Sequence, residues 1–284
     1  MNGRQAGLPA TDRFSSRGKA IFRLCGLVVL TLGLMPPQIC ALLLRLPAAR
    51  AIPRLWHRVA VRIMGWRVVV HGAPSHAPRT LYVANHASYS DIVVLGSLAD
   101  INFIAKAEVA GWPVFGFLAR LHGTMFIERR GAKAAAQRDE IANRLDKGHK
   151  LVLFAEGTSN DGIHVQPFKS ALFSVVHGAA DGPEITLQPV SIAYTRLDGV
   201  PVGRTFLSHF AWYGDMTLVP HLLELLGLGS VTIEVTFHEP VDASRFETRR
   251  ALAEYCHGVV SSGVAASNAG TASDRAAVTA RANS

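Results

Sequence analysis

The chain has 284 residues, 49% hydrophobic and only 18% charged, so it is too apolar for a disordered protein and long enough for a substantial core. Its net charge of +8 is uneven: residues 1–70 carry eleven Lys or Arg against Asp12, whereas the other 214 residues hold 18 basic and 20 acidic side chains. The three cysteines contain no C-x-x-C pair, which excludes a disulfide framework and disfavours a structural zinc site.

An apolar stretch opens the chain. Residues 24–44 are 21 residues without a charge, enough for a helix that crosses a bilayer. Pro36 and Pro37 lie in its middle and remove two backbone donors, and basic residues stand on both sides. Positive flanks prefer the cytoplasmic face. We therefore expect a membrane-embedded helical hairpin rather than a single span or a cleaved signal peptide.

The next segment, residues 45–67, repeats arginine at every fourth position. Arg50, Arg54, Arg58 and Arg62 alternate with aliphatic residues. This spacing predicts a basic amphipathic helix on an anionic lipid surface. Residues 1–70 are thus predicted to anchor the protein to the inner, cytoplasmic membrane, with the remainder facing the cytoplasm. Because the basic residues bracket an apolar segment, we expect no nucleic-acid partner.

Short β-rich runs then alternate with longer helical ones, which predicts an α/β domain over residues 71–260 with a mostly parallel or mixed sheet flanked by helices. The expected strands are residues 67–71, 80–84, 102–105, 124–127, 151–154, 185–194 and 231–237. The expected helices are residues 88–98, 131–147, 168–178 and 247–260. Residues 261–284 are rich in Ala, Ser, Thr and Asn without apolar periodicity, and we predict a disordered tail.

A strand-to-helix turn carries the first candidate chemistry. Residues 85–91 read Asn-His-Ala-Ser-Tyr-Ser-Asp, and Ser88 is a plausible helix N-cap. The first helical turn would bring Asp91 back towards His86. A carboxylate on one imidazole nitrogen fixes the tautomer and strengthens the other nitrogen as a base, so the pair can deprotonate a hydroxyl. On its own, the motif fits equally a turn histidine and a helix-capping aspartate.

Two more polar segments follow predicted strands. Residues 154–162 place Glu156, Gly157 and Thr158 at the carboxyl end of a buried strand, where α/β sheets bind ligands. Residues 123–130 end an apolar strand with Glu128, Arg129 and Arg130. Guanidinium forks suit phosphate or carboxylate groups. Taken singly, each segment also fits an ordinary polar loop or a solvated strand end.

Together these segments resemble the glycerolipid acyltransferases typified by lysophosphatidic acid acyltransferase, in order and spacing over about residues 80–192. The blocks N-H-x-x-x-x-D, G-x-[IVM]-F-I-[DE]-R and F-P-E-G-T-R-S and a later strand are matched by Asn85, His86, Asp91, Gly123, Phe126, Ile127, Glu128, Arg129, Phe154, Glu156, Gly157, Thr158 and Pro189. The segment Pro-Phe-Lys-Ser that contains Lys169 also looks familial.

Two positions depart from the family pattern. Ala155 replaces the usual Pro, and Ser159 replaces an Arg associated with the acceptor's phosphate. The missing guanidinium removes a bidentate donor and weakens the case for a phosphate acceptor. The variant looks more like the branch that acylates lyso-ornithine lipid. Because Arg129, Arg130 and Lys169 remain available for either anion, 1-acylglycerol-3-phosphate stays the alternative acceptor.

The resemblance implies acyl transfer from an acyl-carrier-protein or coenzyme A thioester to a lysolipid hydroxyl, with no metal or bound cofactor. His86 would act as the base and Asp91 would orient it. The expected substrate-binding residues are Glu128, Arg129, Glu156, Gly157, Thr158 and Lys169. Membrane lipids and the thioester carrier are the expected partners. A membrane-bound thioesterase and an inactive lipid-binding protein are the alternatives to a transferase.

Three aromatic residues lie between the first two blocks, namely Trp112, Phe115 and Phe117. They would either line an acyl groove or belong to the core, and the core is at least as good an interpretation from sequence.

Overall fold

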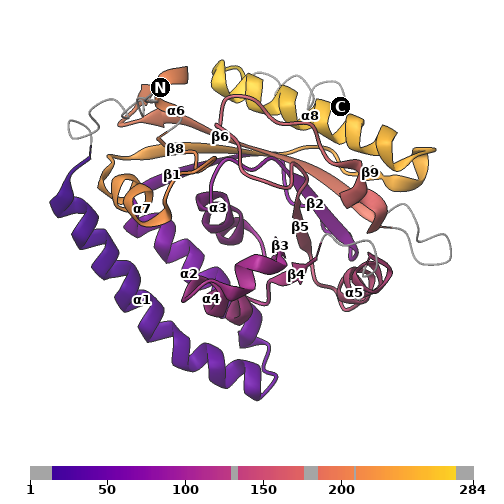
Figure 1. The fold of residues 1–284 in the computed structure, drawn as a ribbon, viewed down its shortest axis with the longest axis horizontal. Helices are drawn as coiled ribbons and strands as arrows, with labels where there is room; N and C mark the ends of the chain where they lie inside the picture. Colours follow the sequence, from indigo (N-terminus) through magenta and orange to yellow (C-terminus); the bar gives the residue numbers. More distant parts are fainter. Residues whose placement is uncertain (1–14, 129–133, 176–184, 208, 273–284) are drawn as a thin grey trace, which may run out of the picture.

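A mixed sheet organises the part of the chain that the computed structural model describes, which is residues 15–128, 134–175, 185–207 and 209–272. The strand order is β1-β8-β6-β2-β5-β3-β4, with β7 and β9 paired to β6 (Figure 1). The strands are β1 (Trp66–His71), β2 (Thr80–Ala84), β3 (Asn102–Lys106), β4 (Met125–Ile127), β5 (Leu151–Phe154), β6 (Thr186–Leu197), β7 (Val200–Pro201), β8 (Val231–Phe237) and β9 (Val241–Asp242). All seven predicted strands are present, which confirms the α/β class.

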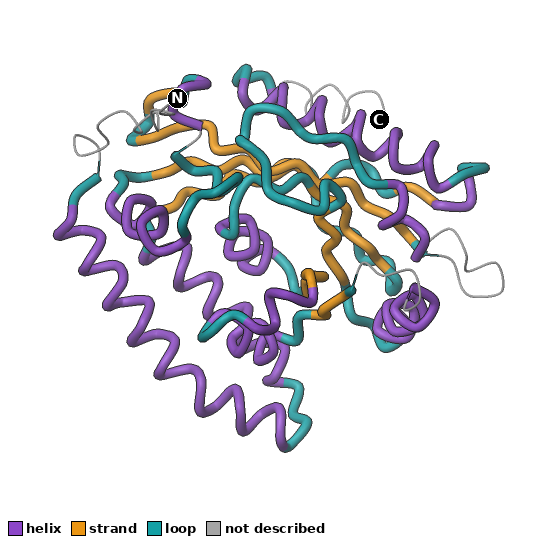
Figure 2. Tube along the Cα trace, viewed as in Figure 1, coloured by secondary structure: helices purple, strands orange, loops and turns teal. Residues whose placement is uncertain are grey.

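Helices flank both faces of this sheet (Figure 2). They are α1 (Arg17–Leu43), α2 (Ala48–Ile63), α3 (Ser90–Leu98), α4 (Phe115–His122), α5 (Ala134–Asp146), α6 (Arg204–Leu207), α7 (Leu218–Gly227) and α8 (Arg249–Asn268). Short 3-10 turns are η2 (Ala107–Gly111), η4 (Ser170–Val175) and η5 (Ala243–Arg245). The segment predicted as a helix over residues 168–178 is thus the turn η4, and residues 176–178 lie outside the described residues.

The central strands are buried on both faces, because successive side chains point into different cores. On β2, Tyr82 and Ala84 join the core formed with α2, α3 and α7, whereas Leu81 and Val83 join the core formed with α5 and α8. Strand β5 alternates in the same way. This explains why both strands consist of uninterrupted apolar residues.

The register of the parallel strands places the polar turns side by side. Ala84, the last residue of β2, is paired with Phe154 of β5 and with Val190 of β6. The residues that follow β2 and β5 therefore emerge at the same edge of the sheet, next to one another. This is the edge at which open α/β sheets hold ligands.

Helix α1 is continuous, so the predicted break at Pro36 and Pro37 is wrong. The two prolines remove two intrahelical hydrogen bonds, but contacts with neighbouring helices hold this part of the helix in place. Directly after them, the amide of Gln38 donates to the carbonyls of Ala49 in α2 and Leu121 in α4, at 3.1 and 2.8 Å. The chain reverses at residues 44–47 instead, and α2 forms the second arm.

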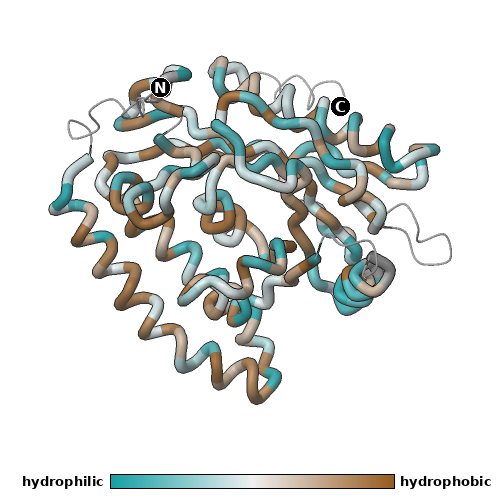
Figure 3. The backbone as a smooth tube through the Cα atoms, in the orientation of Figure 1, coloured by the Kyte–Doolittle hydropathy of each residue, from teal (hydrophilic) through white to brown (hydrophobic). Residues whose placement is uncertain are grey.

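Helix α1 consists largely of hydrophobic residues and lies along the outside of the molecule (Figure 3). Phe22 is 78% exposed and Val29 is 70% exposed. Within the described residues, α1 is the one helix long and apolar enough to cross a membrane. Its amino-terminal part is fastened to α7: Arg23 donates from Nη1 to the carbonyls of Leu226 and Leu228, at 2.9 and 2.7 Å.

The predicted row of arginines is present on α2, and two of these arginines also hydrogen-bond the end of α3. Arg54 and Arg58 donate to the carbonyls of Leu98 and Ser97, at 2.9 and 3.2 Å. These carbonyls end α3 and lack partners within their own helix, and cations are favourable at such ends. The row therefore also caps a helix beneath the sheet.

Helix α8 runs eight residues beyond the predicted end of the domain at residue 260, so a disordered tail over residues 261–268 is wrong. Alanine and serine in this stretch do not prevent helix formation, since alanine has the highest helix propensity. Gly263 lies so close to Ser191 of β6 and to His238 that a Cβ would collide with both side chains. Small residues here allow close packing on the sheet. Residues 273–284 lie outside the described part.

Candidate active site

The turn after β2 brings His86 and Asp91 together. His86 Nδ1 lies 2.9 Å from Asp91 Oδ2, and the imidazole is 19% exposed while the Asp91 side chain has no solvent exposure. The same carboxylate oxygen accepts the backbone N–H groups of Ala87 and Ser88, at 2.7 and 2.9 Å. An oxygen that accepts these donors also accepts from the ring, so Nδ1 carries the proton. Nε2 is the ring nitrogen left to act as a base.

Helix α3 begins at Ser90, two residues later than expected, and Ser88 is not its N-cap. Tyr89 occupies the cap position without a side-chain bond to the helix. The Asp91 carboxylate, inside the first turn, reaches back to the N–H groups before the helix. A negative charge at this end is also favoured by the helix dipole. The backbone thus fixes the carboxylate, and the carboxylate fixes the ring.

Tyr194 of β6 completes the surroundings of Asp91. Its hydroxyl donates to Asp91 Oδ1 at 2.7 Å and lies 2.8 Å from the hydroxyl of Ser90. Burial first, and then the charge of Asp91, raise the pKa of the Tyr194 hydroxyl well above its ordinary value, so it stays a donor. Both oxygens of the buried carboxylate are therefore hydrogen-bonded, as a charge without solvent requires.

Glu156, in the turn that follows β5, hydrogen-bonds the backbone of the turn that holds His86. Its Oε1 accepts the backbone N–H of His86 at 2.7 Å, and its Oε2 accepts from the amide of Asn160 at 2.5 Å and the N–H of Gln166 at 2.7 Å. The side chain is 1% exposed. Burial raises the pKa of Glu156, and these hydrogen bonds act in the opposite direction. Glu156 therefore holds the backbone of His86 and the turn after β5 in fixed positions relative to each other.

Aromatic rings support the imidazole on one side. The His86 ring is stacked on Phe154, the last residue of β5, with centroids 4.0 Å apart and planes 17° from parallel. Phe154 is in turn stacked near Phe103 of β3 at 6.1 Å. With the hydrogen bond to Asp91, this stacking restricts rotation of the ring, which an acid–base group benefits from.

The other predicted site residues are distributed around this turn. Gly157 directly follows Glu156 with φ +70°, a conformation suited to glycine, and Thr158 after it is exposed. Lys169 is exposed, and its backbone N–H donates to the carbonyl of Ala155 at 2.9 Å. Glu128 follows β4 at the edge of the sheet, three strands from β2. Arg129 and Arg130 lie outside the described residues.

Sequence reasoning missed Tyr194 and Asn160. Tyr194 lies in a strand predicted to be buried, and a hydroxyl there must find a partner. That requirement was the available signal, but it does not identify Asp91 as the partner. Asn160 sits in the same polar turn as Glu156, four residues later, and only the fold shows that the two side chains meet.

The aromatic residues Trp112, Phe115 and Phe117 are 38%, 43% and 46% exposed, so the core interpretation is wrong for them. Trp112 packs edge to face with Trp212, whose backbone N–H donates to the carbonyl of Ala87 in the turn that holds His86. Through this contact Trp112 lies close to the turn. A role in an acyl groove stays a prediction.

Within the residues that the structure describes, no three His, Cys, Asp or Glu side chains form a group that could hold a metal ion.

Comparison with known proteins identifies the family. The acyltransferase family profile matches residues 67–193. The chain is 46% identical to the lyso-ornithine lipid O-acyltransferase of Brucella abortus over 80% of its own length and 86% of that protein, and 43% identical to that of Rhizobium meliloti over 80% of each. Its fold is similar to that of the 1-acyl-sn-glycerophosphate acyltransferase of Thermotoga maritima, with TM-score 0.55, 22% identity and coverage of 76% and 78%. The chain belongs to the acyltransferase family, and it is an enzyme that transfers acyl groups.

Proposed function

We propose that this acyltransferase moves a fatty acyl group from a thioester to the free hydroxyl of lyso-ornithine lipid. The His86–Asp91 hydrogen bond, which leaves Nε2 of the partly exposed ring free to act as a base, is the observation that carries the proposal. The similarity to lyso-ornithine lipid O-acyltransferases over most of the chain supports the choice of acceptor. Ser159, in place of the arginine expected for a phosphate acceptor, points the same way.

The proposed reaction needs one base. His86 Nε2 takes the proton of the acceptor hydroxyl while the oxygen attacks the thioester carbonyl. The tetrahedral intermediate collapses to an ester and expels a thiolate, which takes the proton back from Nε2. Asp91 stabilises the imidazolium between these steps. General-base catalysis of this kind accelerates a reaction by about 10²–10⁴-fold.

The acyl donor in this proposal is acyl-carrier protein or coenzyme A in thioester form, consumed as a co-substrate. The proposed chemistry uses no metal and no bound cofactor. We expect Arg129 and Lys169 to contact the anionic part of the acceptor head group, with Glu128, Gly157 and Thr158 forming its surroundings. Glu156 contributes indirectly, through the backbone of His86.

We also propose that the enzyme works at the cytoplasmic face of the inner membrane. The exposed apolar surface of α1 and the basic residues on both sides of it support this placement. Both substrates carry fatty chains, and moving such a chain from a bilayer into water costs about 0.8 kcal/mol per methylene. A docked enzyme avoids most of that cost.

A competition between acceptors tests the proposal. The purified full chain receives a radiolabelled acyl thioester with lyso-ornithine lipid, with 1-acylglycerol-3-phosphate, or with neither. We expect labelled product mainly with lyso-ornithine lipid. More labelled product with 1-acylglycerol-3-phosphate would contradict lyso-ornithine lipid as the acceptor. Release of free fatty acid at the same rate in all three reactions would identify a thioesterase.

A further inference from the structure

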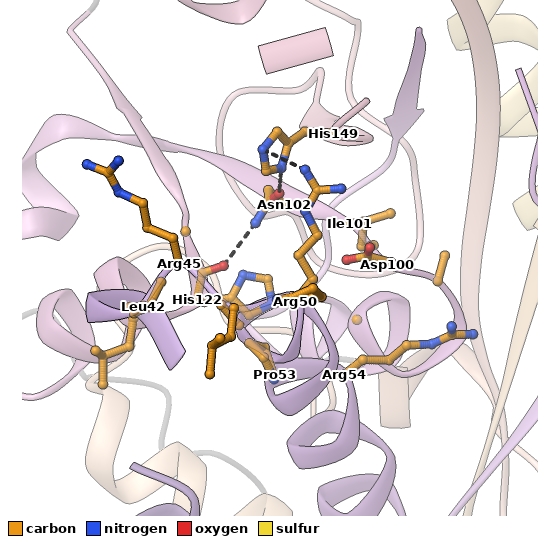
Figure 4. A pocket seen from close by; sticks show the side chains of 17 residues that line it. Leu42, Arg45, Arg50, Pro53, Arg54, Asp100, Ile101, Asn102, His122 and His149 are labelled. Atoms are coloured by element: carbon orange, nitrogen blue, oxygen red, sulfur yellow. Dashed lines mark hydrogen bonds between the residues drawn. The ribbon is translucent and has the colours of Figure 1, made fainter. Parts of the chain in front are cut away.

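A basic cavity lies at the opposite end of the sheet from the His86 turn. It has a volume of about 590 Å³ and is enclosed by the α1–α2 connection, α2, the end of α3, the end of α4 and the start of β3 (Figure 4). Asn102, which lines it, begins β3 beside Leu151, the first residue of β5. His86 follows the other end of the parallel strand β2, so the cavity is separate from the catalytic turn.

The charged side chains of the lining are mostly cationic. Arg45, Arg50 and Arg54 contribute three guanidinium groups, and Asp100 is the one carboxylate among the lining residues. In Figure 4, Arg50 lies between Arg45 and Arg54, whose guanidinium groups point to opposite sides. Arg54 is engaged with the end of α3. Arg45 and Arg50 are the exposed pair.

The position of Arg45 is set by the backbone conformation at the end of α1. Its φ is 53°, in the left-handed region, and the N–H of Leu46 after it donates to the carbonyl of Ala41 at 2.9 Å. This closing bond is usual when a left-handed residue, commonly glycine, ends a helix. Among the described residues, the Arg45 guanidinium has no hydrogen-bond or ion-pair partner. Arg45 therefore occupies a strained backbone position, and its guanidinium group remains available to a ligand.

Arg50 is aimed into the cavity by a chain of hydrogen bonds. His149 Nδ1 lies 3.0 Å from Asn102 Oδ1, and the Asn102 amide donates to the carbonyl of His122 at 2.9 Å. Because Oδ1 can only accept, Nδ1 carries the proton and His149 Nε2 accepts from Arg50 Nη2 at 3.1 Å. Burial, and then the charges of Arg50, Arg144 and Lys147, lower the pKa of His149, while Asp100 opposes them. The local field is positive.

An apolar rim adjoins these cations. Leu42 and Leu46 line the cavity and are 41% and 45% exposed. Leu43 and Leu44 beside them are also exposed. A free inorganic anion would use the arginines and leave the rim uncovered. A phospholipid would place its phosphate at the arginines and its chains along the leucines.

From this arrangement we infer that the cavity binds the phosphate of an anionic phospholipid that is not a substrate, through Arg45 and Arg50. The inference rests on the membrane location in the proposed function. It adds a second lipid site, remote from the chemistry, that holds the enzyme on anionic membranes.

Lipid titrations of the full chain in detergent micelles test the site. Phosphatidylglycerol and phosphatidylcholine with the same acyl chains are titrated in parallel, and affinity is read from the rise in the thermal unfolding midpoint. The test variant is R45Q/R50Q. The matched control is R245Q/R249Q, which removes two exposed arginines that lie outside the cavity lining and outside the arginine row on α2. We expect wild type and control to bind phosphatidylglycerol equally, and R45Q/R50Q to bind it about tenfold or more weakly, as loss of charged hydrogen bonds predicts.

Several outcomes would overturn the inference. One is an equal loss of phosphatidylglycerol affinity in both double variants, and another is equal affinity of the wild type for the two lipids. A third is a stabilisation of the same size with millimolar inorganic phosphate, which would assign the site to a free anion. If R45Q/R50Q melts early without lipid, R45K/R50K replaces it and is compared with R245K/R249K, since lysine keeps the charge and loses the fork. Turnover of lyso-ornithine lipid is measured on the same samples. Absent turnover in the wild type would count against the proposed function, whereas lipid binding decides the cavity separately.

Discussion

The turn that holds His86 and Asp91 and the basic cavity use charged side chains in opposite ways. At the turn, Asp91 and Glu156 are inaccessible to solvent, and all four of their oxygens accept hydrogen bonds from the protein. At the cavity, Arg45 and Arg50 are exposed and have few or no partners inside the protein. The comparison teaches that buried charges whose atoms are all hydrogen-bonded fix the geometry of a site. Exposed charges with few protein partners remain available for a ligand.

Removing the base is the strongest test of the turn. We expect His86→Ala to lower turnover by about 10³-fold, within the range for a general base, because no proton acceptor remains at Nε2. Thermal stability and vesicle binding should stay near wild type. The exposed residue His76 supplies a matched control, His76→Ala, with normal turnover. Equal activity of the two variants would remove His86 from the mechanism.

A partly buried histidine that lines the cavity should control acid stability. Burial lowers the pKa of His122 from 6.5 to about 4, so the folded protein favours the neutral ring. The unfolded chain binds this proton first as the pH falls below 6.5. Folding stability contributed by His122 is therefore present above pH 6.5 and declines towards pH 4, by about 1.4 kcal/mol per pH unit at most.

Unfolding midpoints of wild type and His122→Leu between pH 7 and pH 4 measure this contribution. The variant should lose less stability on acidification, whereas substitution of the exposed His164 by Gln should leave the pH dependence unchanged. Parallel curves for wild type and His122→Leu would contradict the assignment.

Glu156→Gln tests whether a buried carboxylate braces the turn. A carboxamide presents N–H groups to one side of the site, where it faces donors from His86, Asn160 or Gln166. We expect a loss of about 1.5–3 kcal/mol in unfolding free energy and a parallel decrease in turnover. Glu239→Gln, at an exposed glutamate, is the control. A fully stable and active Glu156→Gln enzyme would show that the carboxylate charge is dispensable.

Tyr194→Phe should have the smallest effect. It removes one of the hydrogen bonds to Asp91 and leaves the two backbone donors in place. We expect kcat to fall about tenfold with KM unchanged, which corresponds to about 1.4 kcal/mol of transition-state stabilisation. Tyr82→Phe is the matched control, since the Tyr82 hydroxyl bonds the carbonyl of Ser75 and not the dyad. A change in KM alone would indicate that Tyr194 acts on substrate binding.

The sequence predicted the sheet well, because strands such as β2 and β5 are short apolar runs that end in polar turns. It predicted the pairing of His86 with Asp91 through the spacing of the motif. Helix α7 was not predicted, and its Pro220 lies in the first turn, where proline is tolerated. The continuity of α1, the contact of Tyr194 with Asp91 and the saturation of Glu156 depend on packing between distant segments, which local patterns do not encode.

The bonds from Arg23 to the end of α7 have a mechanical consequence. They lock the apolar helix to the catalytic body, together with the backbone bond from the N–H of Ser16 to the carbonyl of Gly227 at 2.9 Å. These bonds leave no free hinge at this point, so in the proposed membrane-bound enzyme the depth to which α1 inserts would set the height of the imidazole above the lipid. A thicker or thinner bilayer would shift the whole rigid assembly and would change how far an acceptor must rise to be acylated.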